Sequence, residues 1–245
     1  MFEHLKALRK FVYFLAILAV LTFGSMTALV LPVYAQSSTG ANNIFLIPFH
    51  GGNAIAKWER VYNIPYGDGF AILLQTNAQT EGGGYAGIDI GNISGTTLGQ
   101  MNYLGFTVNV TSNAYGHPAF GAGAPRFSII LSNGVVLFAD PFYCSDISST
   151  PLNTWAYFDV VTDSTCVVYT SSGGPLTWSQ VLTDYGSVPI SQLVIIQDDT
   201  PATLHIGVVV VGNTWIAEPW MNGLQGSCTS GASFNCQTGT FPQEE

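Results

Sequence analysis

The sequence predicts an all-β fold, a sandwich or a barrel, with one short helix. From residue 44 to residue 216, short runs that alternate apolar and polar residues are separated by Gly, Asn, Asp, Ser and Pro, as in strands joined by tight turns. One segment alone has helical spacing, and no repeat of solenoid or propeller period occurs. We expect about ten strands in one domain, long enough to bury a core without a metal ion.

Two segments carry the clearest strand pattern. In residues 103–110, the apolar side chains of Leu104, Phe106 and Val108 share one face and polar residues share the other, which predicts a strand with one face in solvent. In residues 204–211 both alternating sets are apolar, as in a strand at the centre of a sheet. The other expected strands are 44–48, 70–76, 85–90, 127–131, 135–140, 156–161, 166–169 and 193–197.

The single helix is expected at residues 177–186. Thr177 has the residue type of an N-cap, and Gly186 stands where a helix commonly ends. Between them, the apolar residues Trp178, Val181, Leu182 and Tyr185 are spaced three and four residues apart. This spacing predicts one apolar helical face that packs on the sheets.

The first 35 residues are predicted to be a signal peptide or an N-terminal membrane anchor. Lys6, Arg9 and Lys10 precede an apolar run at 11–32, and small residues before position 36 suit cleavage after Ala35. The run is also long enough to cross a bilayer, so a retained anchor helix is the alternative. We expect a flexible linker at 36–43, the β domain at 44–220 and a polar tail at 221–245. The protein is therefore expected to be secreted or held at the cell surface.

Charge excludes several classes of partner. Without the first 35 residues, three cations face fourteen acids, a net charge of −11. No basic face can form to hold phosphates, so we expect no nucleic acid partner and no membrane contact beyond the N-terminal segment. A surface with so few charges suits hydroxyl-rich ligands such as polysaccharides, and it also suits self-association.

Four cysteines follow the leader, an even number that predicts disulfides in an exported protein. Of three possible pairings we favour the two local ones, Cys144 with Cys166 and Cys228 with Cys236, the second closing the tail on itself. No CxxC spacing supports a zinc site. Asp198 and Asp199 could offer oxygen ligands to Ca²⁺, but a solvated turn is the simpler interpretation, so no cofactor is expected.

The order of features after residue 122 resembles a known family. The matching parts are "GAPRFSIILSNG", "VLFADPFYC", "TWAYFDV", "TWSQVLTDYG", "ISQLVIIQDD" and "LHIGVVVVGN". This order is similar to that of the jelly-roll domains of secreted carbohydrate-binding modules and their galactose-binding-like relatives. The resemblance implies a jelly-roll β-sandwich that binds carbohydrate. In that family the last strand often carries an Asp or Asn pair for calcium or for hydrogen bonds, and here the corresponding residues are Gly207 and Val208.

Aromatic rings that could stack on sugar faces define the candidate binding residues. Trp155 and Trp178 are assigned to packing, since one opens a core strand and the other lies on the buried side of the helix. The ligand-binding candidates are Trp58, Tyr62, Tyr66, Tyr115 and Trp220.

Arg126 is one of only three cations that follow the leader. It enters a strand, and we expect it to pair with a carboxylate such as Asp140 or Asp159.

No local motif assigns a catalytic residue. GxSxG with its strand–helix context and HExxH are both missing from the sequence, so a binding protein is favoured over an enzyme. A secreted glycoside hydrolase remains an alternative, because Asp89, Asp140 and Asp159 lie in or beside strands and could converge. A second alternative is a structural subunit of an extracellular filament, coat or matrix, in which the segment at 44–49 would complete a neighbour's sheet. The simpler expectation is that this segment is the first strand of its own sandwich.

Overall fold

The computed structural model describes residues 44–62, 64, 69–78, 84–113, 120, 125–198 and 201–217, together with the backbone at 228–229 and 235–236. The chain divides into two units after Thr39, and all described residues belong to the second unit. The predicted signal or anchor at 1–35 and the linker at 36–43 lie outside the described residues. Within the described ranges, the search for a helix with the length and apolarity to cross a membrane finds none.

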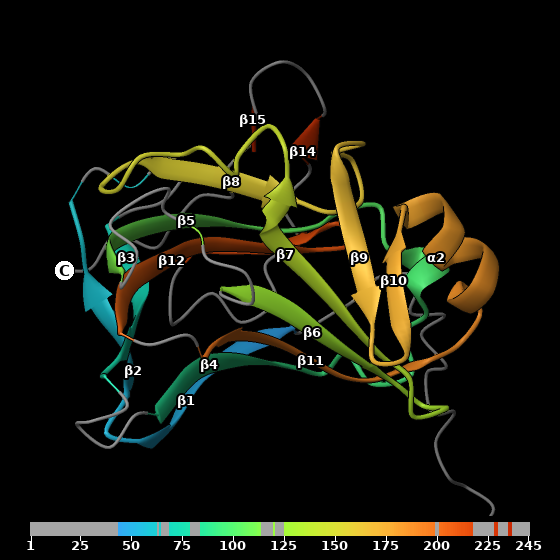
Figure 1. The fold of residues 1–245 in the computed structure, drawn as a ribbon, viewed down its shortest axis with the longest axis horizontal. Helices are drawn as coiled ribbons and strands as arrows, with labels where there is room; N and C mark the ends of the chain where they lie inside the picture. Colours follow the sequence, from blue (N-terminus) through green and yellow to red (C-terminus); the bar gives the residue numbers. More distant parts are fainter. Residues whose placement is uncertain are drawn as a thin grey trace, which may run out of the picture. The chain divides into compact units, whose positions relative to one another are not determined.

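Two antiparallel sheets form the fold (Figure 1). The seven-stranded sheet contains, in spatial order, β1 (Phe45–Gly52), β4 (Gly84–Gly91), β11 (Ile190–Gln197), β6 (Arg126–Leu131), β7 (Val136–Cys144), β9 (Cys166–Thr170) and β10 (Gly173–Leu176). The six-stranded sheet contains β2 (Ile55–Arg60), β3 (Phe70–Thr76), β12 (Ala202–Val211), β5 (Leu104–Asn113) and β8 (Trp155–Asp159), with β13 (Thr214–Ile216) paired to β12. Two elements without strand character are η2 (Leu98–Gln100) and α2 (Trp178–Tyr185).

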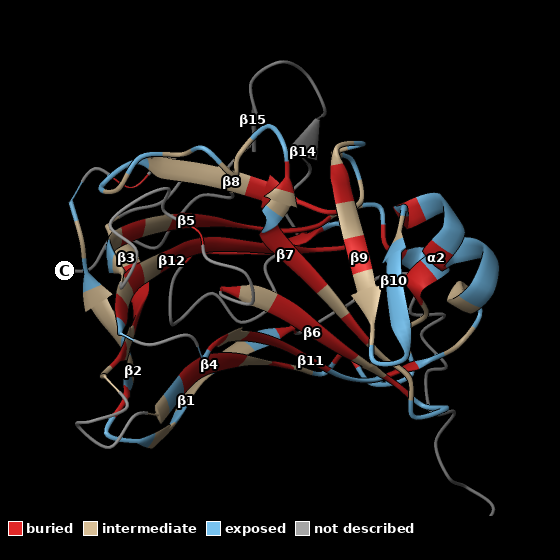
Figure 2. Cartoon of the chain, viewed as in Figure 1, coloured by how far each residue is buried: buried red, intermediate tan, exposed pale blue. Residues whose placement is uncertain are grey.

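The core lies between the two sheets. Phe106 and Phe158 of the six-stranded sheet meet Phe127 of the seven-stranded sheet, with ring centroids 5.1 Å apart for Phe106 and Phe127. All three rings are almost fully buried. Figure 2 shows buried residues running along β5, β12, β6 and β7, and largely exposed residues on β10 and α2. Burying aromatic side chains of this size contributes much of the stability of such a core.

The all-β prediction and each expected strand are confirmed, although the predicted count of about ten is low. Thirteen strands are present in the two sheets of the described ranges. The three strands not predicted from sequence are β2, β10 and β13. In β2 the charged residues Lys57, Glu59 and Arg60 hide the apolar alternation, and β10 contains Gly-Gly-Pro, which argues against a strand.

The expectation of a solvent-facing side on β5 is wrong. Leu104, Phe106 and Val108 face the core, but Gly105 and Thr107 on the opposite face are also buried. β5 lies between β12 and β8, and the Tyr157 side chain of β8 lies over Gly105, where an added Cβ would be 3.0 Å from Tyr157 Oη. By contrast, β12 lies between β3 and β5, as its two apolar faces predict.

The segment that could have joined a neighbouring chain belongs to its own sheet. β1 pairs antiparallel with β4 over eight residues, from Phe45 opposite Gly91 to Gly52 opposite Gly84. Leu46 packs on the core with Ile88 and Ile90. The simpler of the two expectations, an intrachain first strand, is therefore the one observed.

Helix α2 has the predicted caps. The Thr177 hydroxyl accepts a hydrogen bond from the Gln180 backbone N–H, and the Gln180 side chain accepts from the Thr177 backbone N–H at 2.8 Å. This reciprocal arrangement is a capping box. Trp178 and Val181 are buried as expected, whereas Leu182 is 37% exposed.

The Cys144–Cys166 disulfide predicted from sequence is present. It joins the end of β7 to the start of β9, where the two cysteines face each other across the ladder. In the tail, the backbone of β14 (Cys228–Thr229) pairs with that of β15 (Asn235–Cys236). The predicted Cys228–Cys236 bond would involve side chains outside the described residues, so it stays a prediction.

Candidate functional site

A row of side chains crosses the outer face of the six-stranded sheet, the face turned away from the core. Backbone register places one residue from each of five strands directly opposite the next. At the ordinary spacing between strands the row is about 19 Å long. Its members are Lys57 of β2, Leu73 of β3, His205 of β12, Asn109 of β5 and Trp155 of β8.

Strand alternation explains why these side chains share one face. Their neighbours Leu74, Leu204 and Val110 are in the buried core, and successive residues of a strand point to opposite faces. The row therefore lies on the other side of the sheet, where it combines a cation, an imidazole, an amide and an indole.

Glu59 ties the charged end of the row together. His205 Nε2 lies 2.7 Å from Glu59 Oε1, and Lys57 Nζ lies 3.4 Å from Glu59 Oε2. Glu59 reaches past β3, where its cross-strand partner is the small Ala71. The His205 side chain is only 14% exposed, and that of Glu59 is 30% exposed. The pair is thus partly shielded from water, which strengthens its hydrogen bond.

Asn109 contributes a polar atom that has no hydrogen-bond partner among the described residues. Its Oδ1 is buried, and no hydrogen bond reaches it in the described part of the chain. An unsatisfied buried acceptor costs about 1–3 kcal/mol, so a hydroxyl or water that donates to Oδ1 would be stabilised there.

Trp155 extends from β8 across β5 toward β12. A Cβ atom added to Gly207 would lie 3.3 Å from Trp155 Cζ3 and 2.5 Å from Thr107 Oγ1. The Thr107 hydroxyl is held in place because it accepts a hydrogen bond from the Val208 N–H at 2.8 Å. Gly207 therefore provides the space in which the indole lies against the sheet, and Ile64 approaches the same place from the β2–β3 connection.

The residues predicted from sequence to bind ligand are distributed differently. Trp58 is half-buried and packs against the core, and its cross-strand neighbour Ile72 is fully buried. Tyr62 is 79% exposed just beyond β2. Tyr66, Tyr115 and Trp220 lie outside the described residues. Ligand binding by these five residues stays a prediction.

The other described tryptophans differ in where their side chains lie. Trp178 and Trp215 are buried. Trp155, which the sequence analysis assigned to packing alone, is the indole that belongs to the row. Its place in the strand contained a usable signal, since Trp155 and Tyr157 alternate with the core residues Ala156 and Phe158.

The carboxylates considered for a hydrolase belong to different sheets. Asp89 and Asp140 are in the seven-stranded sheet, and Asp159 is at the end of β8 in the other. Burial raises the pKa of Asp159, while a hydrogen bond from Tyr157 Oη and three backbone N–H groups oppose that rise. These bonds fix the turn after β8, which is a structural role.

Arg126 makes a bidentate ion pair with Asp198, at 2.6 and 2.7 Å. Pairing of Arg126 with a carboxylate is confirmed, and Asp198 is a partner that local sequence does not indicate, because it follows β11, the strand paired with β6. The guanidinium carbon also lies 5.4 Å from the centre of the Phe138 ring. The carboxylate and the ring together fix Arg126 on the outer face of the seven-stranded sheet.

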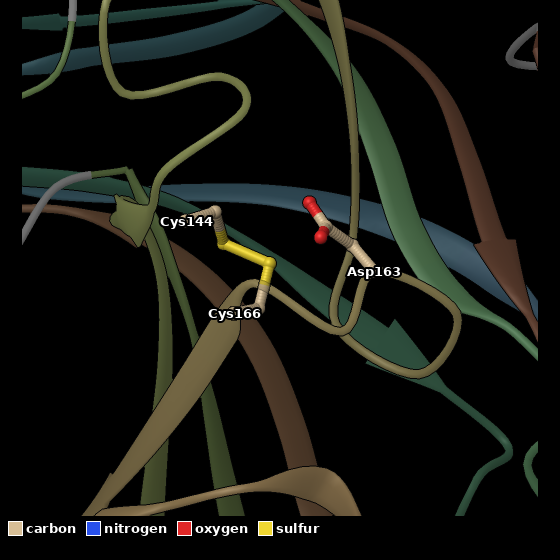
Figure 3. Close-up of side chains that lie close together, drawn as sticks. All are labelled: Cys144, Asp163 and Cys166. Carbon is tan, nitrogen blue, oxygen red and sulfur yellow. A yellow bond between two sulfur atoms is a disulfide. The ribbon is translucent and has the colours of Figure 1, made fainter.

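One cluster of possible metal ligands occurs in the described ranges, formed by Cys144, Asp163 and Cys166 (Figure 3). The two sulfur atoms are bonded to each other, so neither is available as a thiolate ligand. The Asp163 carboxylate accepts hydrogen bonds from the backbone N–H and the hydroxyl of Thr165. We interpret the cluster as a disulfide beside a turn-forming carboxylate.

Neither family models nor curated proteins match the chain. Among solved structures, it has weak similarity to the family 11 carbohydrate-binding module of the cellulosomal cellulase Lic26A-Cel5E of Clostridium thermocellum. That match has a TM-score of 0.38 and 14% identity, and it covers 73% of this chain and 90% of that one. A β-1,2-glucanase from Parabacteroides distasonis matches with a TM-score of 0.36 and 11% identity over 70% of this chain. The chain spans about a quarter of the glucanase, 24% of its length.

Proposed function

We propose that this protein is a non-catalytic carbohydrate-binding module whose ligand lies on the outer face of the six-stranded sheet. The observation that carries the proposal is the juxtaposition of Trp155 with Asn109, whose buried Oδ1 has no partner in the described ranges. A sugar ring has an apolar face that stacks on an indole and hydroxyl groups that donate and accept hydrogen bonds at its edge.

The charged end of the row supplies the remaining polar contacts. Glu59 accepts hydrogen bonds from hydroxyl groups, and His205 presents a second ring nitrogen. Both are already held in place by their mutual contact of 2.7 Å, and a preorganised site loses less side-chain entropy when the ligand binds. Neutral or weakly anionic oligosaccharides suit this combination, since Lys57 is the exposed cation of the row.

We also infer that the two sheets form a jelly roll. The strand orders β3-β12-β5-β8 and β4-β11-β6-β7 support this inference, because successive strands of the chain enter the sheets in the double Greek-key order of that fold.

Secretion is part of the same proposal. It rests on the apolar run at 11–32 and on the even cysteine number.

A glycan array probed with the full-length chain tests the proposed function. We expect binding to at least one oligosaccharide, lost in Trp155→Ala and weakened about tenfold in Asn109→Ala. Leu182→Ala, which removes an exposed side chain from α2, is the matched control and should bind as the wild type does. Thermal unfolding of each variant confirms that it is folded. Full binding by Trp155→Ala, or no binding to any glycan by the wild type, would contradict the proposal.

A further inference from the structure

Three aromatic rings on the edge of the seven-stranded sheet each lie over a glycine of the facing strand. Phe45 is opposite Gly91 in the β1–β4 ladder, Phe49 is opposite Gly87, and Tyr85 is opposite Gly51. We call these three rings, with Ile47 and Asp89 between them, the aromatic row, which consists of Phe45, Ile47, Phe49, Tyr85 and Asp89.

Each ring fills the space that a side chain on the facing glycine would occupy. A Cβ atom on Gly91 would lie 2.8 Å from Phe45 Cδ2, and one on Gly51 would lie 2.6 Å from Tyr85 Cε1. At these two glycines the three nearest atoms all belong to the ring. The glycines therefore let the rings lie low against the backbone instead of projecting from the sheet.

The aromatic row is linear and accessible. Phe45 is 37% exposed, Ile47 is 46% exposed and Tyr85 is 46% exposed. All of them lie on the face opposite Leu46, which packs on the core. From Phe45 to Gly51 the strand rises about 20 Å, so the row is long and narrow. Phe49 and Tyr85 adjoin each other with ring centroids 6.2 Å apart.

A polar group interrupts the rings. Asp89 is opposite Ile47 in the ladder, and its Oδ1 accepts a hydrogen bond from Gln192 Nε2 at 3.2 Å. A carboxylate and an amide placed beside flat apolar rings are the groups that orient sugar hydroxyls over a stacked ring.

We propose that the aromatic row is a second carbohydrate site, one that binds a long neutral polysaccharide lying along β1. This inference shares only the ligand class with the proposed function. The aromatic row lies on the seven-stranded sheet and includes no residue of the candidate site on the six-stranded sheet. A polysaccharide chain places successive sugar rings on Phe45, Phe49 and Tyr85, and a hydroxyl group between them reaches Asp89.

The charge of the aromatic row and of the whole chain limits the classes of ligand that can bind there. The aromatic row contains no cation, its one charged group is a carboxylate, and the whole chain has a net charge of −9. Nucleic acid and anionic lipid are therefore repelled. Exposed aromatic and aliphatic groups gathered in one strip mark a binding surface, and a neutral ligand with apolar faces is the one that fits this strip.

Affinity electrophoresis of the full-length chain tests the aromatic row, in native gels that contain hydroxyethylcellulose, glucomannan, xylan or pullulan. We expect at least one polysaccharide to retard the wild type. Gly91→Ala and Gly51→Ala keep every aromatic residue but displace the rings of Phe45 and Tyr85. Each should raise the apparent Kd about fivefold, the loss of one stacking contact. Both variants should remain as stable as the wild type, since alanine is no worse than glycine in a strand.

The variants of the two sites distinguish the two proposals. Trp155→Ala should lose binding of short oligosaccharides on the array and keep polysaccharide retardation. Gly91→Ala should keep binding on the array, while its apparent Kd for the polysaccharide rises about fivefold. Retardation that is unchanged in both glycine variants overturns the aromatic row and leaves the proposed function standing. A wild type that no polysaccharide retards overturns it as well. A concentration-dependent dimer that is seen in sedimentation and dissociated by Gly91→Ala would also overturn the aromatic row as a carbohydrate site. The occupant would then be a second copy of the chain.

Discussion

His205 and Glu59 are 146 residues apart in sequence, yet His205 Nε2 lies 2.7 Å from Glu59 Oε1. The contact crosses β3, from the middle strand of the six-stranded sheet to its edge strand. It holds the imidazole that lies opposite Asn109 against Glu59 at the charged end of the row. The same contact shapes the candidate site and contributes to the stability of the sheet, and the two effects can be separated by experiment.

Glu59→Gln is expected to weaken ligand binding more than stability. The amide keeps the size of the side chain but removes the carboxylate charge, so His205 loses a charged hydrogen-bond partner. A partly exposed pair of this kind contributes at most about 1 kcal/mol to the free energy of unfolding. A hydrogen bond from the ligand to a charged acceptor is worth more, so we expect Kd to rise about tenfold. Titration calorimetry and urea unfolding measure the two effects. Unchanged affinity together with a large loss of stability would show that the pair is structural.

Gly207→Ala should displace the Trp155 indole. The added methyl group would lie 2.5 Å from Thr107 Oγ1, which is held by the Val208 N–H, and 3.3 Å from Trp155 Cζ3. Because Thr107 is buried and hydrogen-bonded, the strain is shared by the ring, and overpacking of this kind costs about 1–3 kcal/mol. We expect a shifted tryptophan fluorescence maximum, lower stability and reduced glycan binding. Wild-type fluorescence and stability would contradict this placement of the indole.

Asp159 makes stability depend on pH. Burial raises its pKa in the folded protein above the ordinary value of 3.8, despite the opposing hydrogen bonds. The folded state then binds more protons than the unfolded state between 3.8 and the raised pKa, so the contribution of Asp159 to stability increases as the pH falls through that interval. Asp159→Asn does not titrate.

Urea unfolding of wild type and Asp159→Asn from neutral pH to about pH 4 measures this effect. We expect the stability of the wild type relative to the variant to rise as the pH is lowered. A relative stability that falls on acidification would show that the hydrogen bonds outweigh burial.

Thr177→Ala removes the N-cap of α2 and should cost about 1 kcal/mol. The variant loses the hydroxyl that accepts from the Gln180 N–H, and the other half of the capping box is weakened with it. Thr183→Ala is the matched control, because among the described residues this exposed hydroxyl bonds only to the Ser179 carbonyl one turn earlier. We expect the control to unfold within about 0.5 kcal/mol of the wild type. Equal effects of the two substitutions in chemical denaturation would show that the cap is not the cause.

The elements that could be predicted from the sequence are those that depend on residues close together in the chain. The mostly apolar run at 70–76 gives the observed bounds of β3, and the cap residues Thr177 and Gly186 give those of α2. The cysteine pair 144 and 166 was predicted because each cysteine adjoins an expected strand. These signals depend on neighbours a few residues apart, which sequence reading can resolve.

The candidate site was not predictable in the same way. Its row depends on the register of four strand pairs, and register brings together residues as distant as Lys57 and His205. The packing of Trp58 was predictable in part: in β2, Trp58 alternates with Lys57 and Glu59, so if the charged residues face solvent the indole faces the core. The partner of Arg126 likewise followed from the pairing of β6 with β11, which no local pattern reveals.

The side-chain N–H signals of Trp155 and Asn109 provide the most direct test of carbohydrate binding on the outer face of the six-stranded sheet. In a ¹⁵N-labelled full-length chain, titration with the oligosaccharide that binds best on the array should shift both signals together, with one Kd. Perturbation of neither signal while the protein binds the oligosaccharide, or shifts confined to residues of the other sheet, would contradict the account.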